Sequence, residues 1–174
     1  EAPGIVRPAY MGLITQLDDW LGRLFAHMER AGRLDDTLII FTADHGDFLG
    51  DHWLGEKELF YDTVQRVPFI VVGPGVKAGS VSEVPVTGLD FLPTMAELSG
   101  YPAPLPATID GGSMTSVLRN AGAGEVKRQR PYLIFHQAVD RAPQSALRWG
   151  DLKLVKTWKT GKLELFDLSK DLGE

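Results

Sequence analysis

Apolar residues recur with a helical period near the start of the chain. They fall three or four positions apart, at Tyr10, Leu13, Ile14, Leu17, Leu21, Leu24, Phe25 and Met28. This spacing puts them on one face and predicts an amphipathic helix that begins at Tyr10 and ends at Gly32. Residues 1–9 contain two prolines and a glycine, so we expect an irregular lead-in there.

Two short runs further along are apolar without alternation, TLIIFT at 37–42 and VPFIVV at 67–72. Unbroken runs of this length are typical of strands buried on both faces, so they predict central strands of a parallel sheet. A helix is predicted from Asp90, as its N-cap, through Pro93 in the first turn to a stop at Gly100.

The last third of the chain carries four short strand-like runs, at 132–137, 146–149, 152–158 and 163–167. Gly161 supplies a hairpin turn between the last two runs, so a small antiparallel sheet is expected. The weakly patterned stretch 121–130 reads as a loop or domain edge. We therefore predict an α/β portion over 1–120 and an antiparallel β subdomain over 121–174, incomplete at its end.

Composition excludes several classes of protein. The 174 residues are 44% hydrophobic with a formal net charge of -5, which suits a domain with its own core. Lys and Arg are dispersed, which argues against a nucleic-acid partner. There is no apolar run of about 18 residues and no signal-peptide pattern, so no membrane partner is expected, and periplasm and cytoplasm both stay open. The absence of cysteine excludes disulfides, thiolate metal ligands and a cysteine nucleophile within these residues.

Candidate chemistry begins where the first strand ends, at Asp44 and His45. The carboxyl ends of buried strands are where open α/β sheets bind ligands. A carboxylate beside an imidazole offers an oxygen and a nitrogen donor, a mixture that suits Mn²⁺, Zn²⁺ or Ca²⁺. The alternative is that Asp44 is a turn or N-cap residue and His45 is merely hydrogen-bonded.

A lysine follows this pair after a loop that carries Asp47, Asp51, His52 and Glu56. Lys57 is a candidate for neutralising the oxygens of a bound oxyanion, and the alternative is an exposed lysine at the start of a helix. His52 is a candidate general acid, although a hydrogen bond that orders the loop explains it equally well. A short helix or turn over 58–65 is expected to lay Tyr61 back toward the loop.

The order and spacing of these residues resemble the sulfatase family of the alkaline phosphatase superfamily. The matching strings are Thr42-Ala43-Asp44-His45-Gly46, then Leu49-Gly50-Asp51-His52, then Lys57, Tyr61, Asp62, Arg66, Val67 and Pro68. Scaffold strings of the family are also matched by Asp90, Pro93 and Thr94, by Asp110, Gly111 and Ser113, and by Arg148, Gly150, Asp151 and Lys153. Glu58 and Gln65 stand where the family commonly has glycine. The sequence around His52 is similar to that of the phosphonate monoester hydrolase branch.

This resemblance implies an alkaline-phosphatase-like mixed sheet flanked by helices, followed by the small antiparallel sheet. It implies that Asp44 and His45 bind one divalent metal ion, Ca²⁺ or Mn²⁺, and that Lys57 contacts the sulfate or phosphate of a small anionic ester. The implied activity is hydrolysis of sulfate esters, or of phosphonate and phosphate esters, with sulfate and phosphonate undecided.

The family's nucleophile is a formylglycine made from Cys or Ser in an early C/S-x-P-x-R segment, which these residues lack. The chain therefore resembles the second half of such an enzyme, and we expect it to be inactive without the N-terminal half. That half is the partner the resemblance implies, and uncovered sheet edges predict homo-oligomers. The alternative is a non-catalytic, sulfatase-like interaction module.

Overall fold

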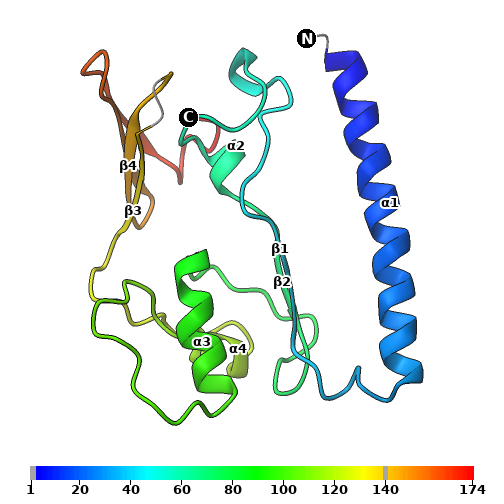
Figure 1. Ribbon diagram of the computed structural model, residues 1–174. Helices are drawn as coiled ribbons and strands as arrows, with labels where there is room; N and C mark the ends of the chain where they lie inside the picture. Colours follow the sequence, from blue (N-terminus) through cyan, green and yellow to red (C-terminus); the bar gives the residue numbers. More distant parts are fainter. Residues whose placement is uncertain (1–2, 139–140) are drawn as a thin grey trace. The chain divides into compact units, whose positions relative to one another are not determined.

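The computed structural model describes residues 3–138 and 141–174 of the chain (Figure 1). They group into two compact units. The first unit combines residues 1–34, 42–68 and 132–174, and the second combines residues 35–41 and 69–131. The division into 1–120 and 121–174 stays a prediction.

Helix α1 runs over Pro3–Arg30, seven residues earlier than the periodicity predicts. Pro8 lies inside it, in the second turn, where the missing N–H removes a single helical bond. The end was predicted correctly. Gly32 adopts a left-handed φ of 62°, and the amides of Gly32 and Arg33 bond back to the carbonyls of Glu29 and Met28, which forms a Schellman motif.

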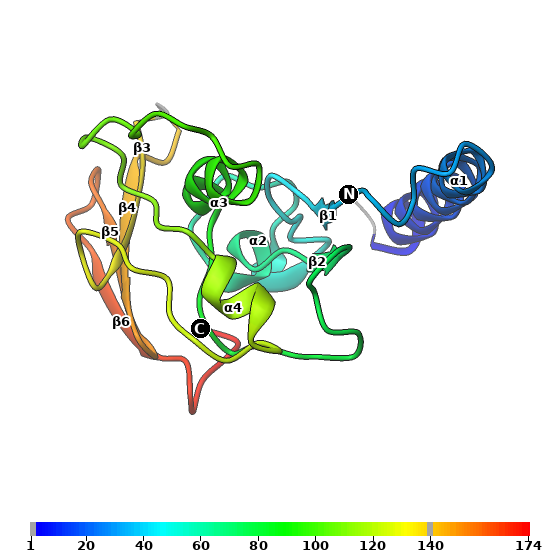
Figure 2. The ribbon, with the colours of Figure 1, turned by 90° about the horizontal axis from the view of Figure 1, so that it is seen from below.

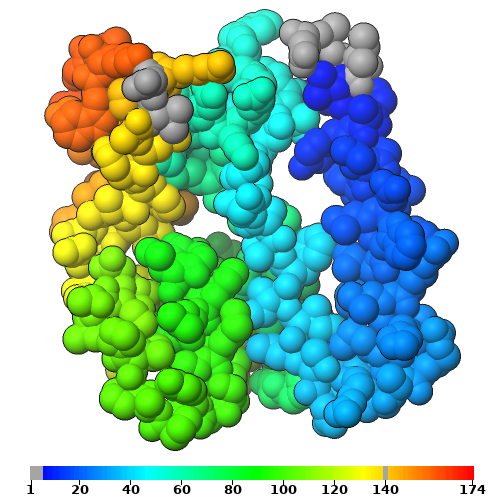
Figure 3. Space-filling view, viewed as in Figure 1, coloured from blue at the N-terminus to red at the C-terminus, as the bar shows by residue number. Residues whose placement is uncertain are grey.

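The apolar face of α1 is exposed along most of its length, and its side chains are drawn in blue in Figure 3. Leu13 and Trp20 are 65% and 59% exposed, and the other exposed members are Tyr10, Met11, Ile14, Leu17 and Leu24. In the part of the chain that the structure describes, no helix combines the length and apolar character needed to span a bilayer.

Two four-residue strands, β1 (Ile39–Thr42) and β2 (Phe69–Val72), pair as a small sheet. Their positions match the two apolar runs. The expected burial on both faces is not observed, because β1 is half-buried throughout and Ile70 and Val72 of β2 are more than half exposed. Within the described residues this sheet has two strands, so neither strand is covered by neighbours on both sides.

The C-terminal strands are β3 (Leu133–Gln137), β4 (Gln144–Trp149), β5 (Leu152–Thr157) and β6 (Leu163–Asp167). They form an antiparallel sheet in sequence order, as predicted (Figure 2). Its inner face buries Ala146 and Val155. Its outer face carries a cross-strand row of exposed or half-buried apolar residues, Ile134, Leu147, Leu154 and Leu165.

A buried lysine ties this sheet to the segment that follows Lys57. The Nζ of Lys153, on β5, is 2.7 Å from Asp62 Oδ1 and 2.8 Å from Glu174 Oε1, and the Lys153 side chain is 1% exposed. Glu174 Oε1 forms an ion pair with Lys153 but no hydrogen bond. The other oxygen of Glu174, Oε2, accepts a hydrogen bond from the backbone amide of Asp62. Asp62 begins the short helix α2 (Asp62–Gln65), and Arg148 lies 3.4 Å from its Oδ2.

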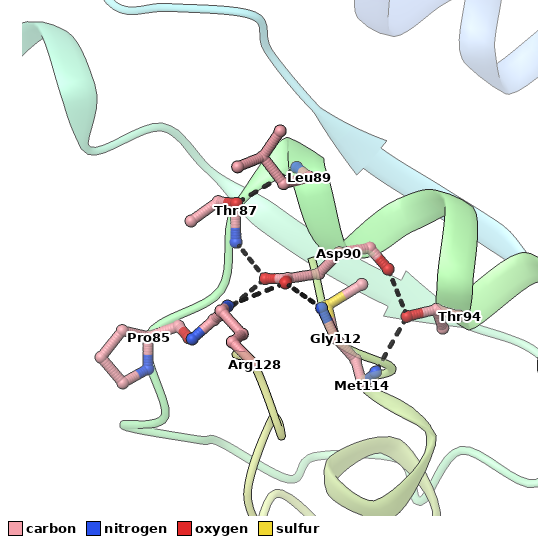
Figure 4. A network of polar contacts seen from close by, with 8 residues as sticks. All are labelled: Pro85, Thr87, Leu89, Asp90, Thr94, Gly112, Met114 and Arg128. Atoms are coloured by element: carbon pink, nitrogen blue, oxygen red, sulfur yellow. Dashed lines mark hydrogen bonds and ion pairs between the residues drawn. The ribbon is translucent and has the colours of Figure 1, made fainter. Parts of the chain in front are cut away.

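The second unit is built around a buried aspartate (Figure 4). Asp90 closes the 3-10 turn η2 (Gly88–Asp90) and precedes α3 (Phe91–Leu98), near where a helix was predicted. Its carboxylate does not cap α3. It accepts the amides of Thr87 and Gly112, and Arg128 binds both of its oxygens at 2.9 and 2.5 Å.

The neighbouring threonine continues this network. Thr94 donates its hydroxyl to the Asp90 carbonyl at 2.6 Å and accepts the Met114 amide at 2.9 Å, just before α4 (Thr115–Arg119). Gly112 has no room for a side chain, because a Cβ there would lie 2.3 Å from the Lys127 carbonyl oxygen. The Asp90 and Gly111–Ser113 strings therefore meet as scaffold, as expected.

Replacing Asp62 by Ala should destabilise the first unit strongly. Removing one partner of a buried ion pair costs about 3 to 5 kcal/mol, and Lys153 would keep only its contact with Glu174. Urea denaturation followed by circular dichroism measures the change. The matched control is Asp19→Ala, which breaks an exposed pair with Arg23. Equal losses in the two variants would contradict this role for Asp62.

Asp90→Asn should destabilise the second unit by at least about 3 kcal/mol, since one amide oxygen cannot replace a carboxylate that accepts four bonds. Asp110→Asn is the control, because its pair with Arg130 is solvent-exposed. Thermal unfolding of both variants compares them, and an unchanged midpoint for Asp90→Asn would rule out the network as a determinant of stability.

Candidate functional site

The predicted site lies in the loop that follows β1. Asp44 is exposed, with 86% of its side chain in solvent, and its Oδ1 accepts the backbone amide of His45. Its other oxygen, Oδ2, lies 3.5 Å from His45 Nε2. The carboxylate and the imidazole therefore face each other at the surface, where both can reach a shared ligand.

The backbone fixes the orientation of the His45 ring. Nδ1 lies 2.7 Å from the Gly46 carbonyl oxygen, which can only accept a hydrogen bond, so Nδ1 carries the proton. Nε2 then carries the lone pair, and it accepts a hydrogen bond from Lys57 Nζ at 2.7 Å. A ring held this way by a backbone carbonyl has the tautomer and aim of a metal-ligating histidine.

Asp44, His45 and Lys57 are thus brought together, as the sequence predicted. Within the described residues, no group of three or more His, Cys, Asp or Glu side chains has the arrangement of a metal site. This part of the chain accordingly offers one carboxylate oxygen and one imidazole nitrogen, a donor set that fits part of the shell of a divalent ion.

A glycine holds the start of the loop against α2. The Gly46 amide donates to the Val64 carbonyl at 2.6 Å, and a Cβ on Gly46 would lie 2.5 Å from the Thr63 carbonyl oxygen. No larger residue fits this backbone approach. The Asp-His-Gly string therefore needs its glycine for packing, a reason that the sequence alone did not reveal.

The loop between Gly46 and Lys57 is held in a strained conformation. Four of its non-glycine residues have left-handed φ values, namely Leu49 (46°), His52 (51°), Trp53 (59°) and Glu56 (64°). Such residues cost free energy and persist where surrounding contacts over-determine them. Here the Phe48 amide bonds to the Glu56 carbonyl, and the short 3-10 turn η1 (Asp51–Trp53) lies between them.

His52 belongs to an aromatic cluster. Its ring stacks on Tyr61 with the centroids 4.5 Å apart and the planes 11° from parallel. The buried Phe48 meets both rings edge-on, and Phe166 of β6 meets Tyr61 edge-on. The expectation that Tyr61 is laid back toward the loop is confirmed.

Two contacts that hold this segment against the C-terminal sheet were not predicted from the sequence. Asp62 binds Lys153, and the Tyr61 hydroxyl makes a long, 3.4 Å bond to Glu164 Oε2 on β6. The motif positions of Asp62 and Lys153 were recognised, but their pairing was not. Lys153 alternates with Leu152 and Leu154, a pattern that predicts an outward lysine, so the sequence carried no local signal for this pairing.

The family model and the related proteins that match this chain describe the same family. Residues 5–101 match the family model described as Sulfatase. A choline-sulfatase from Rhizobium meliloti is 36% identical over 167 residues, which are 95% of this chain and 31% of that protein. The chain spans about 30% of the length of the curated relatives that it matches.

Two solved structures share the fold. One, determined in complex with its substrate D-glucosamine-2-N,6-O-disulfate, has a TM-score of 0.82 at 31% identity and aligns with 92% of this chain and 33% of its own. A phosphonate monoester hydrolase from Silicibacter pomeroyi has a TM-score of 0.76 at 32% identity over 94% and 35%. The α/β fold class predicted from sequence is confirmed.

Tyr61 should titrate late. Burial, followed by the nearby charge of Glu164, raises the pKa of the Tyr61 phenol above its usual value of 10.0. A raised pKa in the folded state means that the neutral phenol favours folding, so this contribution is complete below pH 10 and is lost as the pH rises through the folded-state pKa. Alkaline absorbance titration of the tyrosinate, compared with Tyr61→Phe, measures it. A Tyr61 pKa of 10 or below would contradict the burial argument.

Proposed function

Since the chain belongs to the sulfatase family, we propose that it supplies one side of the active site of a metal-dependent hydrolase of sulfate esters. The observation that carries this proposal is the meeting of Asp44, His45 and Lys57 around one imidazole nitrogen. The related proteins named for choline and for sulfated glucosamine support small organic sulfates as the substrate class.

Asp44 and His45 hold one divalent cation in this proposal, with Ca²⁺ or Mn²⁺ suiting the donor set. Such an ion, when bound, polarises the ester and lowers the pKa of an attacking hydroxyl. The Gly46 carbonyl keeps the proton on His45 Nδ1, so the lone pair is on Nε2. A cation bound there would replace the Lys57 ammonium, which would then turn to the ester. The exposure of Asp44 leaves its second oxygen accessible.

Lys57 binds the anionic group of the ester. Its ammonium lies on the same side of His45 as the Asp44 carboxylate, within hydrogen-bonding distance of Nε2. A positive charge there compensates the charge that the non-bridging oxygens carry in the transition state. Lys57 thus orients the ester and stabilises its reaction.

His52 serves as the general acid, giving a proton to the leaving oxygen when the ester bond breaks. The nucleophile and the remaining metal ligands come from outside these 174 residues, and the family's formylglycine is the expected nucleophile. The partner of this chain is accordingly the N-terminal half of the same enzyme.

A second substrate class is favoured by one comparison. The structural similarity to a phosphonate monoester hydrolase extends over 94% of this chain. Phosphonate monoesters, like sulfate monoesters, present a tetrahedral centre with a single negative charge on non-bridging oxygens, which a metal ion and a lysine can bind. Assays of the full-length enzyme should therefore include aryl sulfates and aryl phosphonates side by side.

Asp44→Ala in the full-length enzyme should lower kcat/KM by more than about 100-fold, because even outer-shell partners of a metal contribute about 10- to 100-fold. It should weaken Mn²⁺ or Ca²⁺ binding by calorimetry. Lys57→Ala should lower kcat/KM by about 100-fold while retaining the metal, because it removes charge compensation alone.

Asp51→Ala is the matched control, since it removes an acid from the same loop whose side chain pairs with Arg7. It should leave both readouts close to those of the unsubstituted enzyme. Unchanged hydrolysis and unchanged metal affinity in Asp44→Ala would overturn the metal role. A full-length protein that binds neither ion and cleaves neither ester would favour a non-catalytic interaction module.

A further inference from the structure

His52 is held more firmly than an ordinary loop histidine. It has a left-handed backbone (φ 51°, ψ 22°), and its ring lies flat on Tyr61 with Phe48 at the edge. Phe48 is 1% exposed, so this contact belongs to the packed core. The next residue, Trp53, is also left-handed but is 99% exposed. The ring contacts of His52 with Tyr61 and Phe48 therefore hold the strained turn.

The platform beneath His52 is itself fixed by the C-terminal sheet. Phe166 packs edge-on against Tyr61 at 6.1 Å, and Glu164 accepts the Tyr61 hydroxyl at the far end of the ring. Lys162 pairs with that glutamate at 2.7 Å. The adjacent Asp62 is locked to the buried Lys153. Tyr61 thus contacts β6 through Phe166 and Glu164, and the His52 imidazole stacks on the face of the Tyr61 ring.

We propose that Tyr61 is a positioning residue for His52, through which the C-terminal sheet sets the direction of proton transfer to the leaving group. This inference rests on the proposed function and adds a role for a residue that touches neither metal nor substrate. Stacking fixes the plane of the imidazole and leaves its ring nitrogens at the edge of the ring, outside the stack.

The step itself balances within the proposed reaction. A hydroxyl nucleophile gives its proton to water and forms a bond to sulfur or phosphorus, and the bond from that atom to the leaving oxygen breaks. The leaving oxygen keeps the bonding electron pair and takes a proton from protonated His52, which becomes neutral and regains a proton from water. A misaligned imidazole would slow this step most for leaving groups that are poor without protonation.

The first test measures the stack on the chain itself. Nuclear magnetic resonance of the His52 ring protons should show an upfield ring-current shift, because the ring lies over the Tyr61 face. Tyr61→Leu should abolish the shift and Tyr61→Phe should keep it. Phe60→Leu is the matched control, since Phe60 packs on Phe135 instead. A His52 signal that is the same in the unsubstituted chain and Tyr61→Leu would overturn the inference.

The second test uses the full-length enzyme with phenyl and 4-nitrophenyl esters. Tyr61→Leu should lower kcat for the phenyl ester about 10-fold, which is less than the roughly 100-fold effect of losing a general acid. It should barely change kcat for the 4-nitrophenyl ester, whose leaving group needs little protonation. His52→Phe keeps an aromatic ring on the stack but cannot donate a proton, so it should show the larger form of the same pattern.

Adding Tyr61→Leu to His52→Phe should cause no further loss for the phenyl ester, because residues that act as a unit are not additive. Equal losses for both esters, or additive losses in the double variant, would show a merely structural Tyr61 and overturn the inference. If Asp44→Ala abolishes hydrolysis while His52→Phe has no effect, metal-dependent hydrolysis stands, and both the general-acid role of His52 and the positioning role of Tyr61 fail.

Discussion

A buried lysine organises the first unit. Lys153 is held between Asp62 and Glu174 at hydrogen-bonding distances, with almost no exposure to solvent. An ammonium group in such surroundings requires its carboxylates, so the position of α2 on the sheet is dictated by charge rather than by apolar packing alone. Because Asp62 directly follows Tyr61 and lies five residues after Lys57, this ion cluster also sets where the candidate active-site loop is anchored.

The elements were predictable because local rules decide them. Helical periodicity and Gly32 located most of α1 and its end, and the four C-terminal strands appeared where short strand-like runs predicted them. The early start of α1 was missed because Pro8 was read as a breaker, although a proline near the start of a helix costs little. Asp90 was predicted to cap the helix because an acidic residue before a helix usually does so. In the structure its carboxylate instead binds Arg128, 38 residues away.

The proximity of the candidate residues was predictable from the sequence, and the contacts that support them were not. Asp44, His45 and Lys57 were identified from type and spacing, and the fold brings them together. The pairing of Asp62 with Lys153 joins residues 91 positions apart, which no local pattern encodes. Alternation would even turn Lys153 outward and its leucine neighbours inward, yet β5 buries the lysine and exposes Leu152 and Leu154. Charge pairing overrides the hydrophobic pattern there.

That inverted strand has a consequence for interpreting genetic variation. A substitution at Lys153 or Glu174 changes residues of the C-terminal sheet and tail, yet it would loosen α2 and, through it, the loop that carries His52. In a screen that records turnover alone, such variants would be indistinguishable from defects in the reacting groups. Variants in this region should therefore be sorted by protein abundance before any chemical role is assigned to them.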